Sequence, residues 1–243
     1  MIKLKIDQYL LLMISMVKKL DWDSNFFNLK VGEIVVEEYK STFDTASFDL
    51  LYVYGKKEFE LIIHQFENTF SEVKVKYCKK IFTKNINSNN IFSIHDVKID
   101  IQDLYQLAFE SGKSSRFLLD NKFDDNKFKE LYKAWIENSI SKKIADDILV
   151  YIEKNELLGF VSYKISNEKA SVGLIAVNPN HQGNKIGGKL LAKLENVLLD
   201  KNINEIIIPT QLANIQAFNF YKKQNYSIIE TIYIKHYWKN DTF

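Results

Sequence analysis

The segment 172–188, VGLIAVNPNHQGNKIGG, carries the clearest chemical signal in this chain. Its apolar run, 172–177, stops at Asn178-Pro179, and a polar loop with glycines follows. Apolar residues then recur at helical spacing, at Ile186, Leu190, Leu191, Leu194, Val197 and Leu198. Free backbone N–H groups converge at a helix start, the helix dipole favours an anion, and glycine lets a phosphate approach closely. The segment therefore predicts a phosphate site or, on a plainer interpretation, an ordinary strand–loop–helix connection.

Helices and strands that would position this segment follow the polar tract 85–90, NINSNN. The periodicity predicts two helices, a hairpin, the strand and helix above, and then a strand, a short helix and a last strand or strand pair. Their ranges are 99–111, 128–140, 148–152 with 157–165, 172–177, 186–198, 206–208, 214–223 and 226–238.

The tract 85–90 is also the best candidate for a domain boundary. The residues before it predict a small β-β-α-β unit, with its helix over 56–70. We therefore predict an N-terminal α/β domain at 1–93, which includes an extra N-terminal segment at 1–15, and a second domain at 94–243.

The composition limits the classes of function. Of the 243 residues, 46% are apolar, which is enough for a substantial core, and a net charge of +2 gives no reason to expect nucleic acid. Cys78 is the only cysteine, so an intramolecular disulfide is excluded and a reducing cytoplasm fits. The four histidines have no ligand spacing, and we predict no metal. No run approaches the ~18–20 apolar residues of a membrane span, and 9–17 is interpreted as an extra helix or strand, not a signal peptide.

The loop HQGNKIGG resembles the acyl-CoA pyrophosphate loop of the GNAT (Gcn5-related) N-acetyltransferases, whose pattern is Gln/Arg-x-x-Gly-x-Gly/Ala. Gln182 opens the pattern and Gly187 closes it, but Lys185 stands where the middle glycine is usual. Because lysine disfavours positive φ, we expect the loop to adopt a φ that lysine tolerates, or to shift. Alternatively, Lys185 brings a positive charge to the CoA phosphates.

This resemblance implies an α/β (α+β) protein with the GNAT fold, in which a mixed, mostly antiparallel sheet is splayed beside the strand 172–177. It implies acetyl-CoA, or another short acyl-CoA, as the co-substrate. Pantetheine would pair with the backbone of that strand, and the pyrophosphate would lie on the loop. The CoA-binding residues that it implies are Ile175, Val177, Gln182, Gly183, Asn184, Lys185, Ile186, Gly187, Gly188 and Asn214.

Tyr221 is the catalytic candidate. Asn214 is a good N-cap, and Tyr221 lies two helical turns later, where it could equally be a core tyrosine. By the resemblance, a tyrosine here is the general acid that protonates the departing CoA thiolate, because a phenol of pKa ~10 stays protonated at neutral pH. The amine would attack the thioester directly, and a backbone N–H of the strand 172–177 would hold the oxyanion.

Four segments resemble the dTDP-amino-sugar N-acyltransferases, above all the dTDP-fucosamine (dTDP-4-amino-4,6-dideoxygalactose) N-acetyltransferases. They are SRFLLDNKFDDNKFKELYKAWIENS, LGFVSYKI, VGLIAVNPNHQG and TQLAN with the later FY. The resemblance implies transfer of an acetyl or another short acyl group, such as 3-hydroxybutanoyl, to a dTDP-Fuc4N or dTDP-Fuc3N type sugar. Surface polysaccharide (O-antigen) synthesis, a cytoplasmic location and a homodimer are implied with it, without a nucleic-acid or membrane partner.

The same resemblance implies an acceptor site between the two domains, with Ser115, Arg116, Phe117 and Asp120. Arg116 either forms a fork with the nucleotide diphosphate or caps the preceding helix near 111–112. Phe117 is more consistent with a core residue than with a sugar platform. The general base is left open among Asp120, Asp124, Glu110 and His181.

Two other functions stay open. One is a GNAT enzyme that acts on a peptide or protein N-terminus, and the other is a non-catalytic CoA-binding module.

Overall fold

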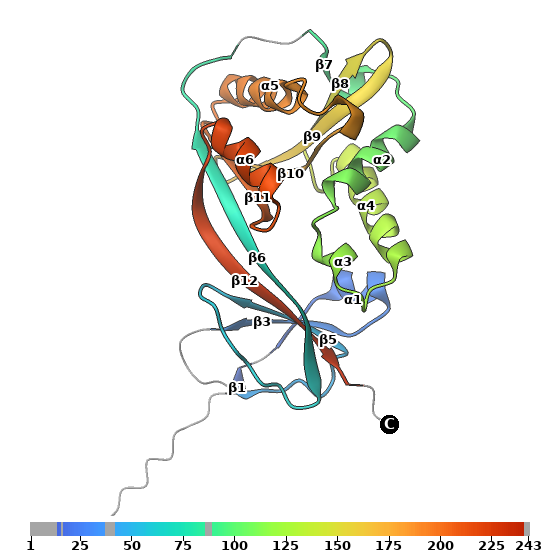
Figure 1. The fold of residues 1–243 in the computed structure, drawn as a ribbon, viewed down its shortest axis with the longest axis vertical. Coiled ribbons are helices and arrows are strands. Elements are labelled where there is room, and N and C mark those ends of the chain that lie inside the picture. Colours follow the sequence, from blue (N-terminus) through green and yellow to red (C-terminus); the bar gives the residue numbers. More distant parts are fainter. Residues whose placement is uncertain (1–13, 16, 37–41, 86–88, 241–243) are drawn as a thin grey trace, which may run out of the picture. The chain divides into compact units, whose positions relative to one another are not determined.

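The computed structural model describes residues 14–15, 17–36, 42–85 and 89–240, so that most of the predicted extra segment at 1–15 lies outside the described residues. By its contacts the chain forms two compact units, Met1–Ser71 with Tyr233–Phe243, and Glu72–Ile232. Strands β6 (Phe66–Lys80) and β12 (Ser227–Lys239) each run from one unit into the other (Figure 1).

These units divide the chain elsewhere than at the boundary 93/94 that the sequence suggests. The cause is β6, whose residues 74–80 pair antiparallel with β11 (Glu205–Gln211) of the second unit. The chain leaves the second unit's sheet at Lys80, where β6 ends, and re-enters it at Ile91, where β7 (Ile91–Ser93) begins.

The first unit is built on four strands in the order β2 (Lys18–Lys19), β3 (Val31–Val36), β5 (Leu50–Gly55) and the end of β12. β3 and β5 are parallel, and the other two pairs are antiparallel. Helix α1 (Asp21–Phe27) precedes β3, and β1 (Ile14–Ser15) pairs with β4 (Thr42–Phe43) in a separate two-stranded sheet.

The helix predicted over 56–70 is wrong. Residues 56–65 form no regular element, and β6 begins at Phe66. Ile63 and Phe66 are buried against β5 and β12 residues, but Ile62 is 98% exposed and Gln65 has a left-handed φ of 66°. Tertiary packing of a few apolar side chains therefore overrides an apparent helical period.

The second unit has a mixed, mostly antiparallel sheet in the order β6, β11, β10, β9, β8 and β7, with the start of β12 beside β6. Only β10 and β11 run parallel in this series. Its remaining elements are β7 (Ile91–Ser93), η1 (Ile94–Asp96), α2 (Ile101–Ser111), α3 (Arg116–Leu119), α4 (Asp125–Ile140), β8 (Asp147–Glu153), β9 (Glu156–Ser166), β10 (Lys169–Val177), η2 (Pro179–His181), α5 (Ile186–Asp200) and α6 (Ile215–Lys223).

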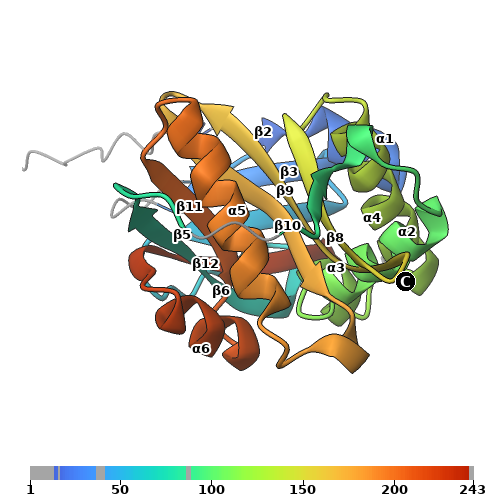
Figure 2. The ribbon, with the colours of Figure 1, turned by 90° about the horizontal axis from the view of Figure 1, so that it is seen from above.

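Helices cover both faces of this sheet. Figures 1 and 2 show α5 and α6 on one face and α2 and α4 on the other. The predicted stripe of α5 is buried in the core with strands β9–β11, at Ile186, Leu190, Leu191, Leu194 and Leu198. An apolar stripe on each helix thus fixes it to one face.

The structure confirms the fold class and the element order predicted after residue 94. The hairpin turns at Lys154-Asn155, where both residues have positive φ, 51° and 65°, as a two-residue type I′ turn requires. The sheet of the second unit also contains β6, which the sequence placed in the other domain. This strand lies between β11 and β12.

Candidate functional site: a splayed sheet beside an uncapped helix

Strands β10 and β11 pair over only part of their length. Their ladder holds at two positions, Ala170 with Ile206 and Ser171 with Ile207, and stops there although both strands continue. Among the described residues, the edge of β10 that faces β11 therefore has no strand partner beyond Ser171. Unpaired backbone N–H and C=O groups on such an edge can pair with an extended ligand.

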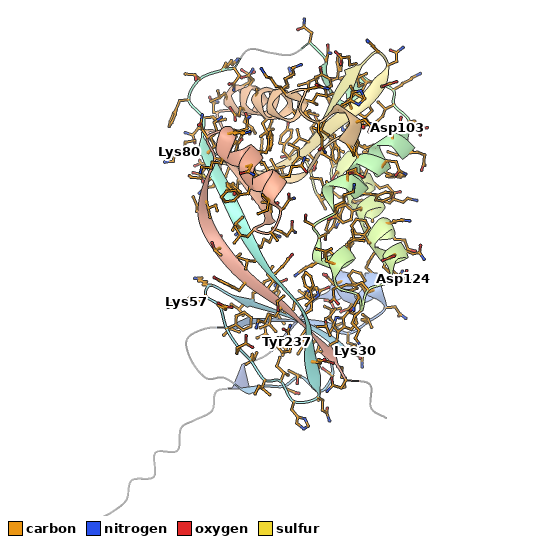
Figure 3. All side chains as sticks on the ribbon, viewed as in Figure 1. Lys30, Lys57, Lys80, Asp103, Asp124 and Tyr237 are labelled. Carbon is orange, nitrogen blue, oxygen red and sulfur yellow. The ribbon has the colours of Figure 1, made fainter. Side chains whose placement is uncertain are left out.

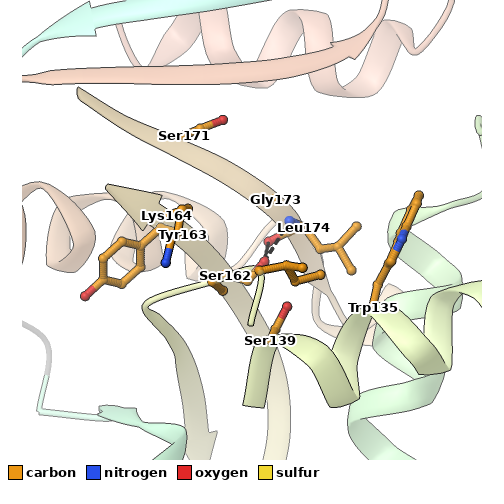
Figure 4. A pocket seen from close by; sticks show the side chains of 10 residues that line it. Trp135, Ser139, Ser162, Tyr163, Lys164, Ser171, Gly173 and Leu174 are labelled. Carbon is orange, nitrogen blue, oxygen red and sulfur yellow. Dashed lines mark hydrogen bonds between the residues drawn. The ribbon is translucent and has the colours of Figure 1, made fainter. Parts of the chain in front are cut away.

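A bulge lies in β10 at the point where the ladder ends. The register with β9 shifts between Val172 and Ile175, and the Ser162 hydroxyl oxygen accepts a hydrogen bond from the Leu174 N–H at 2.9 Å (Figure 4). Ser162 is buried, and it replaces the strand partner that the bulge removes.

The open edge belongs to Ile175 and Val177. The Asn178 N–H donates to the Leu158 carbonyl of β9 at 2.8 Å. Backbone groups of successive strand residues point in opposite directions, so Ala176 also faces β9, while Ile175 and Val177 face the other way. The backbone N–H and C=O groups of Ile175 and Val177 therefore point toward the splay. These are the two strand residues that the sequence assigned to CoA.

The start of α5 has no side-chain cap. Its N-cap position is occupied by Lys185, which makes no capping hydrogen bond. The other α-helices of the second unit, α2, α3, α4 and α6, are capped by Asp100, Ser115, Asp124 and Asn214. The first N–H groups of α5, at Ile186, Gly187 and Gly188, are thereby left to a ligand, and the helix dipole makes an anion the favoured one.

Lys185 contradicts the expected conformation. It has φ 62° and ψ 12°, which is the left-handed region that the sequence analysis expected a lysine to avoid. A non-glycine residue there costs ~1–2 kcal/mol. The surrounding loop holds it in place: Gln216 of α6 donates to the Gln182 side-chain oxygen at 2.7 Å, and Gln182 donates to the Val177 carbonyl at 3.4 Å.

The glycines of the loop meet different requirements. Gly183 has φ 83° and no neighbour within 4 Å of a Cβ, so its need for glycine is conformational. A Cβ on Gly187 would lie 3.1 Å from the Phe220 ring, so this glycine also lets α5 approach α6. Gly188 has only the Gln224 side-chain end nearby, at 3.4 Å, and Asn184 lies exposed in the turn.

Tyr221 is buried between α6 and the sheet, with 3% of its surface exposed. Its ring lies 5.2 Å from that of Tyr77 on β6 and 6.0 Å from that of Tyr226. Burial raises the pKa of Tyr221 far above the ordinary phenol value, with Tyr77 adding to the shift. Tyr221 therefore stays protonated at every physiological pH, as a general acid must before it donates.

Tyr77 was not a candidate from the sequence. Its hydroxyl is buried without a hydrogen-bond partner among the described residues, and burial raises its pKa. Asn214, by contrast, does what its type predicts, because its side-chain oxygen accepts from the Ala217 N–H at 3.0 Å and caps α6.

The four predicted acceptor residues surround the short helix α3. Ser115 caps it through the Phe117 N–H at 3.3 Å, and Asp120 ends it with its side chain 1% exposed. Phe117 is buried, with its ring 5.6 Å from Phe123 and 6.1 Å from Trp135, which agrees with a core role.

Arg116 lies in an electrostatic cluster that includes two residues of β6. Its charge acts on Glu72 and Lys74, and its guanidinium lies 4.8 Å from the Phe117 ring centre. Tyr132 joins the cluster through a hydrogen bond with Ser115, and burial raises the pKa of Tyr132 to about 12. The alternation VKVK at 73–76 could have indicated a charged face of a strand, but not which helix it faces.

The candidate bases have different environments. Glu110 is paired with Lys113 at 2.6 Å, and Asp124 accepts from the Asn126 N–H at 2.7 Å as the cap at the start of α4 (Figure 3). His181 ends η2 beside the loop, and its Nδ1 is buried with no partner among the described residues. Glu110 and Asp124 thus have their carboxylates engaged in pairing and capping.

A cavity of about 270 Å³ borders the bulge on the α4 face of the sheet (Figure 4). Trp135 and Ser139 of α4 line one side of it, and Ser162, Gly173 and Leu174 line the other. Among the described residues, no group of three or more His, Cys, Asp or Glu side chains could hold a metal. No helix in the same part of the chain is long and apolar enough to cross a membrane.

Comparison with known proteins gives the class of this fold and site. Residues 100–226 match the model of the acetyltransferase (GNAT) family. Because the match covers more than half of the chain, the chain belongs to this family, and the matched region is an acyl-CoA-dependent N-acyltransferase domain. The solved structures to which this chain is similar include acetyltransferases in complex with coenzyme A or acetyl coenzyme A, at TM-scores of 0.45 and 0.34.

Individual relatives are distant. The chain is 24% identical over 139 residues to the spore coat polysaccharide biosynthesis protein SpsD of Bacillus subtilis, over 57% of this chain and 48% of that protein. It is 25% identical over 151 residues to the spermidine N(1)-acetyltransferase of Thermoplasma acidophilum, over 57% of this chain and 91% of that protein. A solved GNAT-family structure from Novosphingobium aromaticivorans has a TM-score of 0.54 at 9% identity, over 79% of this chain and 75% of that one, which shows the fold alone.

Proposed function

We propose that this protein transfers an acetyl or another short acyl group from acyl-CoA to the amine of a dTDP-linked amino-dideoxy sugar. The observation that carries the donor half is the uncapped start of α5 beside the unpaired edge of β10. An extended thioester arm that ends in a pyrophosphate has the shape and charge to satisfy both sets of backbone groups at once.

In this proposal Ile175 and Val177 pair with the pantetheine arm, and residues 182–188 hold the pyrophosphate. The amine attacks the thioester carbonyl carbon, the C–S bond breaks, and Tyr221 donates its proton to the departing thiolate. The proton that the amine loses passes to solvent or to a base. Binding both substrates in one complex supplies the proximity that the reaction needs, and a buried phenol supplies the proton without a covalent intermediate.

Helix α3 and one relative support the acceptor half. Arg116 has a guanidinium whose planar fork suits a diphosphate, and Ser115 and Asp120 cap the two ends of the same short helix. The relative from Bacillus subtilis has a name in polysaccharide biosynthesis, although the match spans about half of its length. A dTDP-Fuc4N or dTDP-Fuc3N type sugar, made for a surface polysaccharide, unites these observations with the resemblance in the sequence.

A polyamine or a peptide N-terminus is the second candidate, since one relative is a spermidine acetyltransferase and another an N-alpha-acetyltransferase. The charges favour the sugar. Arg116 and Lys74 lie close enough for the arginine to lower the pKa of the lysine, and such a pair of cations repels a polycationic acceptor.

The test offers the purified protein several acyl-CoAs with dTDP-Fuc4N, dTDP-Fuc3N, spermidine and an N-terminal peptide, and measures released thiol and product mass. We expect thiol release and an acylated product with one of the two nucleotide sugars. Turnover of spermidine or the peptide instead would contradict the acceptor half, and no turnover with any pair would contradict the whole proposal.

We also propose a cytoplasmic homodimer, because the resemblance implies both. Light scattering on the purified protein tests the dimer, and a mass that corresponds to one chain would contradict it.

A further inference from the structure

Strand β6 presents two kinds of side chain on its two faces. Lys79 reaches Glu195 of α5 at 2.7 Å, and the Tyr77 ring contacts Tyr221 of α6, so the odd-numbered positions face α5 and α6. Side chains alternate along a strand, so Glu72, Lys74 and Lys76 point to the opposite face. That face is also the one covered by α2 and α4.

Two cations and one carboxyl group gather there. Burial lowers the pKa of Lys74, and the neighbouring Arg116 lowers it further, while Glu72 acts in the opposite direction. Burial raises the pKa of Glu72 against the effect of Arg116 and Lys74. Two desolvated cations that lie close together repel each other, and an anion that contacts both removes this cost.

Neither β6 residue of this cluster is satisfied within the described part of the chain. The Oε2 oxygen of Glu72 is buried without a hydrogen-bond donor. No carboxylate of the described residues forms an ion pair with Lys74, whereas Lys76, two residues later on the same face, lies 2.7 Å from Glu230. Buried polar groups in native proteins normally have partners, so an open oxygen and an unpaired lysine side by side indicate a ligand.

We propose that Lys74 and Arg116 together bind the diphosphate of the nucleotide-sugar acceptor, and that Glu72 accepts a hydrogen bond from a hydroxyl group of the same substrate. This inference rests on the proposed function, and it adds the residues of β6 to an acceptor site that otherwise consists of α3. The diphosphate removes the repulsion between the two cations, and the hydroxyl group supplies the donor that Glu72 lacks.

The site also separates the two diphosphates that the reaction brings together. CoA has its pyrophosphate on backbone N–H groups at the start of α5. The acceptor's diphosphate would lie on side-chain cations, on the opposite face of the sheet from α5. Each nucleotide thus has its own anion site.

Calorimetric titration of dTDP into the full-length protein saturated with CoA tests the proposal, because CoA then occupies the loop. We expect Lys74→Met to weaken dTDP binding about 10-fold or more, as expected for loss of a charge-assisted contact. The matched control is Lys76→Met on the same strand and face, which should stay within about twofold of the unchanged protein. CoA affinity should be equal in all three proteins.

A folding defect in Lys74→Met would show as weakened CoA binding, and Lys74→Arg then serves instead, with dTDP affinity retained if the role of the residue is its charge. Unchanged dTDP affinity in Lys74→Met, or equal losses in Lys74→Met and Lys76→Met, would overturn the inference and leave the proposed function standing. Absence of both dTDP binding and sugar turnover in the unchanged protein would instead overturn the proposed function.

Discussion

The proposed CoA loop and the proposed acceptor cluster would bind anions in different ways. The loop at 182–188 offers backbone N–H groups at a helix start, and the side chain at its N-cap position takes no part in capping. The cluster of Glu72, Lys74 and Arg116 offers charged side chains from two distant segments of the chain. A backbone site leaves a continuous signature in the sequence, whereas a site made of side chains from separate elements leaves none.

This difference also separates what is common to a family from what is particular to one protein. Members that share a CoA thioester as donor can bind it at the same helix start. The acceptor varies, and two of the residues that we propose to select it, Glu72 and Lys74, lie on a strand outside the matched region 100–226.

Replacement of Tyr221 should have the largest effect on the donor side. We expect Tyr221→Phe to lower kcat by about 10²-fold or more, the range of general-acid catalysis, with little change in KM for acyl-CoA. The matched control is Tyr77→Phe, which removes a buried hydroxyl that has no partner in the described part of the chain and should leave both kcat and stability nearly unchanged. Steady-state kinetics on both variants test this role. Equal rates for Tyr221→Phe and the unchanged protein would show that Tyr221 is not the general acid.

The pH dependence gives a second test of Tyr221. A general acid works only while it is protonated, and burial raises the pKa of this phenol. Loss of its proton therefore begins above the range of an ordinary tyrosine, and kcat should show no decline from this group up to about pH 10. A decline in kcat near pH 8 or 9 that Tyr221→Phe abolishes would contradict the raised pKa of Tyr221.

Replacement of Ser162 at the bulge of β10 should have a smaller effect, mainly on the free energy of unfolding. Ser162→Ala leaves the half-buried Leu174 N–H without its acceptor, which should lower the free energy of unfolding by about 1 kcal/mol. The KM for acyl-CoA should rise as the edge of β10 loses its shape. Ser171→Ala, at an exposed position of β10, is the control for urea denaturation, and equal midpoints for the two variants would show that the bulge does not need Ser162.

Lys185 should show the smallest effect on stability. Lys185→Gly relieves a left-handed φ but adds freedom to the unfolded chain, so the free energy of unfolding should change by less than about 1 kcal/mol. If the lysine charge acts on the CoA phosphates, CoA affinity falls in Lys185→Gly and in Lys185→Asn, most clearly at low salt. Unchanged CoA affinity in both variants would contradict a contact between the Lys185 charge and the CoA phosphates.

Much of the second unit could be predicted because its signals are local. The stripe of α5, the cap at Asn214 and the turn at 154–155 each depend on a few neighbouring residues, and the structure has all three. The boundary between units could not be predicted in this way, since it depends on the pairing of β6 with β11, more than 100 residues later.

The conformation of Lys185 shows a limit of local rules even within the loop. Residue preference alone excluded a left-handed lysine, but the contacts of Gln182 with Val177 and Gln216 hold the loop in this shape. Glu72 and Lys74 were missed for a related reason. Their alternation with valines is that of any half-exposed strand. Only the folded structure shows that Arg116 lies near them.

The central claim is that the splayed sheet and the charged cluster serve one reaction, acyl transfer to a nucleotide amino sugar. Its most direct test is the mass spectrum of the product formed from acetyl-CoA and dTDP-Fuc4N or dTDP-Fuc3N, with the Tyr221→Phe protein beside the unchanged one. We predict a nucleotide sugar heavier by one acetyl group, formed much more slowly by the variant. CoA release with spermidine or a peptide and none with either sugar would contradict the claim.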